Sequence, residues 1–436
     1  MRNGAGMRLL KHIGKIMAII GLAVAAAGVT MILVYLIPTE RMFANAQKSV
    51  GIFENEGGSA QLIHGYQGTA LDNYTDSWML RIATYDGSES TADKAFHNYY
   101  YYGDKLYSDM CQSTIAYLKE EDQGRNRADY ARYWHGYLLI LKPLLFVFDY
   151  GDIRQILKMC SLFLVLYLAV LLERVGLKDA VLPFGGMLIF LEFGTIGMSM
   201  QYTWVFLIAA AFSVLILRKF RKCGDNTDWL FLSIGCLTSF FDFLTYPLFT
   251  LALPLLMLCM CYGLQERKPV KTFLCRVFLA ALHWGIGYAG MWAGKWICLD
   301  LFWKGGAIRD GINSILFRSG RQDAEYTFAE AVMKNIDVLL KWPYVLCAVF
   351  VLGMVLFGVR QKQELRPELL AAYCGIAALP FAWYFISLNH SYIHATMTYR
   401  ELSITAFAGM LAVLELKEGW NWRKDQKKSG KIRKIG

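Results

Sequence analysis

Two carboxylates four residues apart, Asp72 and Asp76, lie in a polar stretch otherwise made of amides, hydroxyls and aromatic side chains, residues 71–80. If the stretch is helical, this spacing puts both on one side. Two nearby carboxylates push their pKa values apart, so one can stay ionised as a general base while the other orients an acceptor or holds a cation. Because Asp also favours turns, either residue taken alone is equally well explained as part of a loop.

Other polar residues fall near the same ends of apolar segments. Carboxylates and histidines can act as bases, whereas Arg and Lys neutralise the charge that develops on a phosphate leaving group. The segments that carry these groups are far apart in the sequence and are predicted to converge on one face. The candidate substrate-binding residues are Arg132, His135, Asp242, Tyr246, Arg318, Arg321, His390, His394 and Arg400.

Metal and nucleotide chemistry have weaker support. His390 and His394 are four residues apart, which suits zinc, but neither a Glu partner nor a third nearby ligand completes such a site. The sequence has no glycine-rich phosphate loop of the P-loop or dinucleotide type. We therefore expect no certain cofactor, with a divalent cation at the carboxylate pair as the one candidate.

Three further acidic residues are better explained by structure than by chemistry. Asp149 and Asp152 are predicted to cap the start of the helix that follows, because Asp favours the N-cap and the first turn. Glu192 stands alone within an apolar segment. A charge at that depth is costly, so Glu192 is predicted to pair with another buried residue.

The composition shows what must position these residues. Of the 436 residues, 56% are hydrophobic and only 18% are charged, against about 25% charged in soluble domains. Repeated apolar runs of about 17–22 residues are long enough to cross a bilayer. We therefore predict an all-α polytopic membrane protein with about ten transmembrane helices, in which residues 1–436 form a single integral membrane domain in contact with the lipid bilayer.

The charge pattern gives an orientation. We expect spans at residues 15–37, 153–173, 180–198, 203–217, 228–244, 247–264, 275–302, 338–358, 368–387 and 402–416. Lys and Arg cluster in the short loops at 218–222, 267–271 and 360–366 and in the tail from 417 to 434. This is the positive-inside distribution, so the net charge of +10 indicates topology and not a nucleic-acid partner. The prediction is a multi-pass cell-membrane protein with both termini in the cytoplasm.

Residues 39–134 then form a long external loop after the first span. A loop of this length usually contains helices of its own, and residues 108–129 have helical spacing. The aromatic tract at 98–103 is more simply explained by packing on the bundle than by ligand stacking. Residues 133–148 are apolar but short and contain Pro143, which predicts an interfacial or re-entrant helix.

The order of a first span, a long acidic external loop and a short apolar helix before span two resembles the GT-C superfamily of membrane glycosyltransferases. The superfamily includes the protein O-mannosyltransferases and the aminoarabinose transferases. The residues that carry the resemblance are Tyr130-Ala131-Arg132-Tyr133-Trp134-His135-Gly136-Tyr137, Pro143 and Asp152-Ile153-Arg154. The resemblance covers the topology of most of the chain, and its motifs are loose.

One feature departs from the family pattern. Many members have an adjacent acidic pair soon after span one, whereas Glu54 and Glu56 here are separated and Asp72 comes later. The departure leaves open which carboxylate is catalytic. The late segment from Asn389 to Arg400 looks like a subgroup that acts on bacterial cell-surface polysaccharides.

The resemblance implies a polyprenyl-phosphate-linked sugar donor and transfer on the external face to a glycan, lipid or protein acceptor. An acidic residue of the first loop, Asp72 or Asp76, would deprotonate the acceptor, and the lipid phosphate would leave. Arg400 is predicted to contact that phosphate, because its charge is otherwise costly. The alternatives are a transporter or flippase of lipid-linked sugars and a polysaccharide polymerase or ligase outside this superfamily. A transporter predicts charges deep in the bundle, whereas most charges here lie at the external ends.

Overall fold

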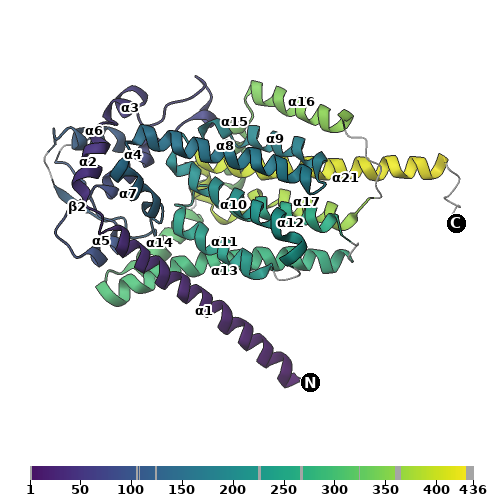
Figure 1. Ribbon diagram of the computed structural model, residues 1–436, viewed down its shortest axis with the longest axis horizontal. Helices are drawn as coiled ribbons and strands as arrows, with labels where there is room; N and C mark the ends of the chain where they lie inside the picture. Colours follow the sequence, from purple (N-terminus) through teal and green to yellow (C-terminus); the bar gives the residue numbers. More distant parts are fainter. Residues whose placement is uncertain are drawn as a thin grey trace.

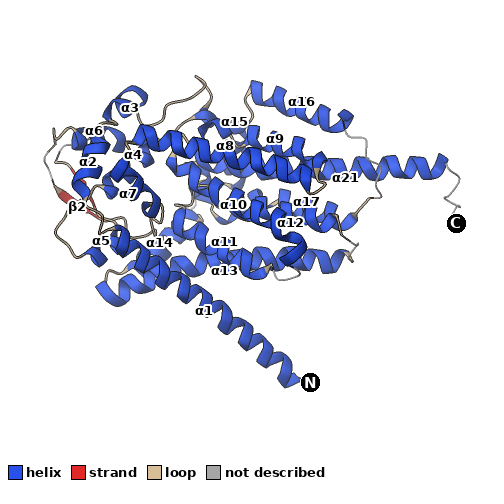
Figure 2. Ribbon diagram, viewed as in Figure 1, coloured by secondary structure: helices blue, strands red, loops and turns tan. Residues whose placement is uncertain are grey.

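The protein is almost entirely helical, with one small two-stranded sheet (Figure 2). The computed structural model describes residues 2–104, 107, 109–122, 125–223, 227–265, 269–323, 325–358 and 365–428. The basic positions 267–268, 360–364 and 431–434, which mark predicted cytoplasmic segments, lie outside the described residues.

Five helices among the described residues are long and apolar enough to cross a bilayer, which indicates an integral membrane protein. They are Gly6–Val34 within α1 (Arg2–Val34), α8 (Tyr150–Arg174), Met200–Lys219 within α10 (Met200–Cys223), α13 (Val270–Trp303) and Pro367–Ile386, which joins α17 (Pro367–Ala377) to α18 (Leu379–Ile386). Other expected spans fall on helices that do not meet this criterion: α9 (Val181–Phe190), α11 (Asp228–Phe241), α12 (Leu248–Gly263), α16 (Trp342–Gly358) and α21 (Leu402–Lys428).

The continuous span expected at 180–198 is not one helix. Helix α9 ends at Phe190, Glu192 takes the left-handed conformation with φ 55°, and the 3-10 helix η3 (Phe193–Thr195) follows. Thr195 donates a hydrogen bond to the Glu192 carbonyl at 2.8 Å and accepts one from Arg400 at 3.0 Å. Non-helical backbone in a membrane protein is tolerated where protein groups satisfy it, and buried polar side chains do so here.

The helices of the bundle lie side by side along the long axis in Figure 1. Helices α11 and α13 approach closely because each has a glycine in the interface. A Cβ at Gly235 would lie 2.0 Å from the Trp284 carbonyl oxygen, and one at Gly287 would lie 2.2 Å from that of Leu232. Only glycine fits such a backbone approach.

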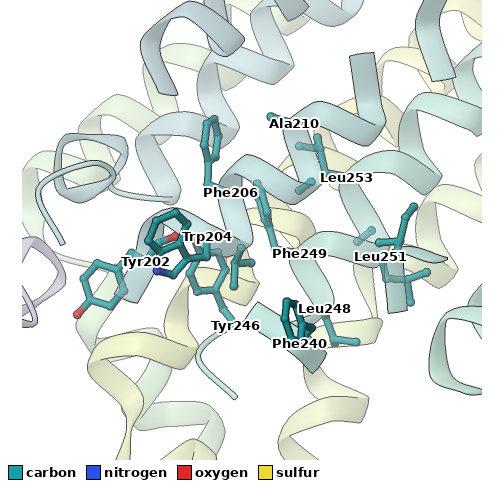
Figure 3. Close-up of a cluster of buried hydrophobic side chains, with 14 of the residues drawn as sticks. Tyr202, Trp204, Phe206, Ala210, Phe240, Tyr246, Leu248, Phe249, Leu251 and Leu253 are labelled. Carbon is teal, nitrogen blue, oxygen red and sulfur yellow. Dashed lines mark hydrogen bonds between the residues drawn. The ribbon is translucent and has the colours of Figure 1, made fainter. Parts of the chain in front are cut away.

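Aromatic side chains fill the interface of α10 and α12 (Figure 3). Phe206 and Phe249 have ring centroids 6.4 Å apart, and Tyr246 lies edge-on to Phe249. The Tyr246 hydroxyl donates to the Tyr202 carbonyl oxygen. The first turns of the two helices are thus joined at the end of the bundle that faces the polar loop.

The long loop after the first span has helices of its own, as predicted, and they gather at one end of the molecule (Figure 1). They are α2 (Thr39–Gln47), α3 (Val50–Glu56), α4 (Asn73–Ala83), α5 (Thr91–His97) and α6 (Met110–Leu118). The helix expected over 108–129 ends at Leu118. Strand β1 (Tyr100–Tyr102) pairs antiparallel with β2 (Asn126–Ala128), so a strand replaces the end of that helix.

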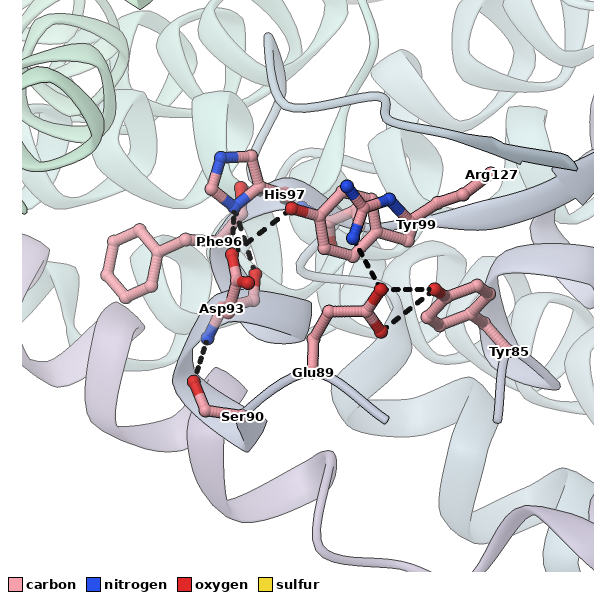
Figure 4. A network of polar contacts seen from close by, with 9 residues as sticks. Tyr85, Glu89, Ser90, Asp93, Phe96, His97, Tyr99 and Arg127 are labelled. Atoms are coloured by element: carbon pink, nitrogen blue, oxygen red, sulfur yellow. Dashed lines mark hydrogen bonds and ion pairs between the residues drawn. The ribbon is translucent and has the colours of Figure 1, made fainter. Parts of the chain in front are cut away.

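A polar network fixes the part of this loop around β1 (Figure 4). Tyr85 donates to both oxygens of Glu89 at 2.9 Å, and Arg127 pairs with Glu89 at 2.5 Å while its guanidinium lies over the Tyr99 ring. The Tyr99 hydroxyl donates to Asp93 at 3.2 Å. These contacts join residues before and after β1, so the loop has a defined conformation without a disulfide between the described cysteines.

The short apolar helix after this loop is α7 (Leu138–Val147), which contains Pro143. Helix α8 then begins with Asp149 as its N-cap, where the carboxylate accepts from the Asp152 backbone N–H at 2.9 Å. The predicted capping role of Asp149 is confirmed. The loop after α13 contains α14 (Ala307–Arg318) and α15 (Phe328–Leu339), and the segment before α21 contains α19 (Leu388–Ile393) and α20 (Ala395–Thr398).

Candidate functional site

A cavity of about 430 Å³ lies where the long loop meets the later loops. Its lining comes from α4, the segment before α7, the start of α10, the turn between α11 and α12, the end of α14 and the segment around α19. Of the eleven predicted site residues, four line it: Asp72, Arg318, His390 and His394. Residues from across the sequence therefore converge on one site.

One carboxylate oxygen of Asp72 accepts a hydrogen bond from the protein, and the other accepts none from the described residues. Asp72 is the N-cap of α4, where Oδ1 accepts from the Thr75 backbone N–H at 3.1 Å, and its own N–H donates to the Ser199 hydroxyl at 2.9 Å. Oδ2 is buried and has no hydrogen-bond partner among the described residues. Burial raises the pKa of Asp72, an effect opposed by the bonds from Thr75 and by the charge of Arg400. A desolvated carboxylate in a cavity is a base candidate.

Asp76 belongs to the same helical turn but faces away from the cavity. Its Oδ2 accepts from the Tyr150 hydroxyl at 2.6 Å and from the Met200 N–H at 2.7 Å, and its Oδ1 accepts from the Gln201 N–H at 3.0 Å. A carboxylate on the first N–H groups of α10 is favourable, because the helix N-terminus is electropositive. Burial raises the pKa of Asp76 to about 7.

This geometry separates the roles of the two carboxylates. Both oxygens of Asp76 are occupied by protein donors, so only one oxygen of Asp72 remains. A single free oxygen does not fit the divalent cation considered for this pair, because such ions take several oxygen ligands. The proposed reaction therefore uses no bound cation.

A partly buried ion pair holds the start of α4 in place. Arg154 forms a two-point contact with Glu56, each N···O distance being 2.8 Å, and also donates to the Asn73 side-chain oxygen at 2.7 Å. Asn73 completes the triangle by donating to Glu56 at 2.8 Å. Glu56, an acidic residue of the loop after span one, thus fixes the position of Asn73, the residue next to Asp72.

Aromatic rings form one wall of the cavity. Trp78 stacks on Tyr130 with centroids 4.4 Å apart, and Tyr74 and Tyr133 extend the wall on either side. The Trp78 Nε1–H is buried without a partner among the described residues. The sequence does not predict this wall: Trp78 stands two residues after Asp76 in the polar stretch, and Tyr130 belongs to the residues that carry the family resemblance.

Next to this wall, the lining carries one fixed cation and two histidines. Arg318, at the end of α14, has its guanidinium 5.4 Å from the Tyr133 ring centre. His390 donates from Nε2 to the Leu244 carbonyl at 2.7 Å, which leaves Nδ1 as an acceptor, and its ring centre is 4.6 Å from that of His394. Burial and the charge of Arg318 lower the pKa of His394 to about 4, so both the fixed charge and a neutral imidazole face the cavity.

Asp242 and Tyr246 do not line the cavity but belong to the turn between α11 and α12, part of which does. Asp242 accepts from the backbone N–H groups of Leu244 at 2.9 Å and Thr245 at 3.1 Å. Leu244 has φ 73°, which is costly for a side chain of this size, by about 1–3 kcal/mol. The Asp242 carboxylate therefore holds the strained turn whose carbonyl oxygen orients His390.

Three other predicted residues lie outside the lining. Arg132 forms a two-point ion pair with Asp310, with N···O distances of 2.9 and 3.0 Å. His135 is buried, where it donates to the Tyr130 carbonyl at 2.8 Å and so helps to hold the aromatic wall. Arg321 is exposed.

Arg400 is fully buried and contacts protein groups. Its guanidinium donates to the Thr396 carbonyl at 2.7 Å and to the Thr195 hydroxyl at 3.0 Å, and it lies 3.7 Å from the centre of the Tyr202 ring. The charge of Glu192 acts on Arg400 electrostatically, while the pairing of Glu192 with a particular buried residue stays a prediction. Arg400 does not line the cavity, so the structure does not place it where the predicted phosphate contact requires.

Among the described residues, no group of three or more His, Cys, Asp or Glu side chains is arranged to hold a metal ion. The chain matches no protein-family model, and searches of curated proteins and of solved structures find no match.

Proposed function

We propose that this protein is a membrane glycosyltransferase of the GT-C type, which moves a sugar from a polyprenyl-phosphate donor to a cell-surface glycan, lipid or protein on the external face. The observation that carries the proposal is the buried Asp72 carboxylate, whose Oδ2 has no partner among the described residues, at a cavity lined by aromatic rings and Arg318. A base, a ring-stacking wall and a fixed positive charge are the groups that transfer from a phosphate-linked sugar requires.

Each of these groups has one role in the proposed reaction. Oδ2 of Asp72 takes the proton of the acceptor hydroxyl, whose oxygen attacks the anomeric carbon of the donor sugar. The bond between that carbon and the phosphate oxygen breaks, and the phosphate leaves with the electron pair. Arg318 stabilises the charge that develops on it, because a guanidinium binds phosphate with several donors in a fixed geometry.

The uncharged part of the cavity lining also suits the sugar of the donor. Stacked Trp78 and Tyr130 offer an apolar face, and the Trp78 N–H and the Nδ1 of His390 supply one donor and one acceptor for hydroxyl groups. A carbohydrate needs both kinds of contact. The volume of about 430 Å³ is in the range of sites for small ligands.

We also propose that all ten expected segments span the membrane. Ten spans, with both termini in the cytoplasm, put residues 39–134 on the external face. The five long apolar helices and the basic clusters at 218–222 and in the tail support this arrangement. The cavity then lies on the side where lipid-linked sugars are consumed.

The test uses the purified protein in liposomes with a panel of polyprenyl-phosphate sugars, each labelled in the sugar, and a cell-envelope extract as the acceptor. We expect one donor to lose its sugar with release of polyprenyl phosphate and a labelled product. Movement of intact donor across the bilayer without release would support the transporter alternative instead. No change in any donor across the panel would count against both.

A further inference from the structure

Helix α14 has an apolar flank that no described part of the protein covers. Its buried side consists of Gly311 and Ser314. Next to that side, Ile308, Ile312 and Ile315 are 38%, 49% and 45% exposed. The spacing of four and three residues lines them up along one side of the helix.

The orientation of this flank is fixed by three contacts. Gly311 lies against the Trp296 ring of α13, where an added Cβ would approach to 2.6 Å. Asp310 is held by its two-point ion pair with Arg132. At the far end, Asn389 donates to the Phe317 carbonyl at 2.9 Å. The isoleucines therefore cannot turn inward without breaking this packing.

The flank continues the lipid-facing surface of α13. The last turns of that candidate span expose Ile297, Leu301 and Phe302, the latter two by 69% and 68%. Helix α14 begins four residues after α13 ends at Trp303, across Gly305 and Gly306. Trp at the end of a span is typical of the headgroup level, so α14 begins where the hydrocarbon ends.

The other side of α14 is polar over its first two turns, where Arg309 and Asn313 are exposed, four residues apart, and turned away from the isoleucines. Phe317, one turn further along this side, is 40% exposed, so the polar character ends before the last turn. An amphipathic helix with this pattern lies in the plane of the membrane interface, with its apolar side in the acyl-chain boundary. A water-soluble surface would leave three neighbouring isoleucines exposed for no gain.

We propose that α14 is a membrane-surface helix, with lipid covering Ile308, Ile312 and Ile315. The last residue of the same helix is Arg318, which lines the cavity. In 12 residues, α14 thus connects the bilayer surface with the cation of the site. Resting on the proposed function, this means that the phosphate at Arg318 belongs to a lipid-anchored donor that comes to the cavity along α14, and not to a soluble one.

The first test measures what covers the flank. An environment-sensitive fluorescent amino acid is placed at Ile312 or, as the matched control, at Asn313, which is about 100° away on the same turn. In liposomes, we expect the probe at 312 to emit at shorter wavelength and to be quenched by lipids spin-labelled near the headgroup end. The probe at 313 should be quenched by iodide in water.

Two results would overturn the proposal. Quenching of the 312 probe by iodide and not by labelled lipid would put the flank in water. Protection of that probe from both quenchers would mean that a second copy or another protein covers it.

The second test links the helix to the donor. Ile312→Asp should raise the KM for a long-chain polyprenyl-phosphate sugar several-fold with little change in kcat, whereas Asn313→Asp should not. A donor with a short, water-soluble chain should show no difference between the two variants. An equal effect on both donors would refute the donor route. The fluorescence measurement needs no turnover, so the membrane contact stands or falls separately from the proposed reaction.

Discussion

The assignment of Asp72 as the base predicts that Asp72→Asn abolishes most transfer while the protein still folds. The Asn side chain keeps an oxygen for the Thr75 N–H, and Asn and Asp are similar N-caps. The variant also removes a buried carboxylate whose Oδ2 has no partner in the described part of the chain. Because the cap is kept, we expect the free energy of unfolding to change by less than the roughly 1 kcal/mol that the loss of an N-cap costs.

The loss of activity should be much larger. Removal of a general base typically lowers the rate by about 10²–10⁴-fold, which corresponds to about 3–5 kcal/mol of barrier. The effect should fall on kcat, because the amide fills the same volume and the aromatic wall is unchanged. Loss of transfer with unchanged donor binding is the expected pattern.

The assay compares donor consumption by the wild type, by Asp72→Asn and by Asp149→Asn in liposomes, with thermal unfolding of each. Asp149 is a matched control, because it also caps a helix through one carboxylate oxygen but lies outside the cavity. Near-normal transfer by Asp72→Asn would refute the assignment. Asp242 and Glu54 do not line the cavity, so the base would then have to be one of its histidines, His390 or His394.

Three further outcomes follow from the same geometry. Asp76→Asn should lower the free energy of unfolding by about 1–3 kcal/mol, because an amide cannot accept from all three donors around Asp76; thermal unfolding in detergent measures this, and an unchanged midpoint would contradict it. Arg318→Gln should raise the donor KM about 10- to 150-fold, the equivalent of about 1.5–3 kcal/mol for hydrogen bonds to a charged group, whereas Arg321→Gln, exposed and outside the lining, should not. Since the charge of Arg400 lowers the pKa of Asp72, Arg400→Gln should move the acidic limb of the pH–rate profile to higher pH and Arg400→Lys should leave it in place; a limb that does not move in either variant would exclude this coupling.

The sequence predicted the helices well where the signal is local. Apolar runs placed α8, α10 and α13, and the Asp149 cap follows from the residues next to it. The break at Glu192 was not predictable in the same way. It depends on the hydrogen bond between Thr195 and Arg400, which lies 205 residues further along the chain. A hydropathy average over neighbouring residues cannot detect a contact at that separation.

The candidate site shows the same limit. Spacing predicted that Asp72 and Asp76 share one side of a helix, whereas Asp72 caps α4 and lines the cavity and Asp76 in the first turn does not. Spacing could not show that the first N–H groups of α10 occupy Asp76, because Met200 is 124 residues away. The cost of a buried charge predicted that Arg400 contacts an anionic phosphate, whereas the structure surrounds it with partners from the protein. Those partners are carbonyl, hydroxyl and aromatic groups of the protein, and only the tertiary structure identifies them.

The environment of Asp72 balances two opposing requirements of a base. Burial raises its pKa, which makes the carboxylate more basic than one in water, but too large a rise would leave it protonated and inactive at neutral pH. The bonds from Thr75 and the charge of Arg400 act in the other direction. Arg400 does so from outside the cavity, where its own charge is fixed by Thr396 and Thr195 and cannot follow the substrate. Under the proposed function, a cation held in this way would tune the base without competing with Arg318 for the phosphate.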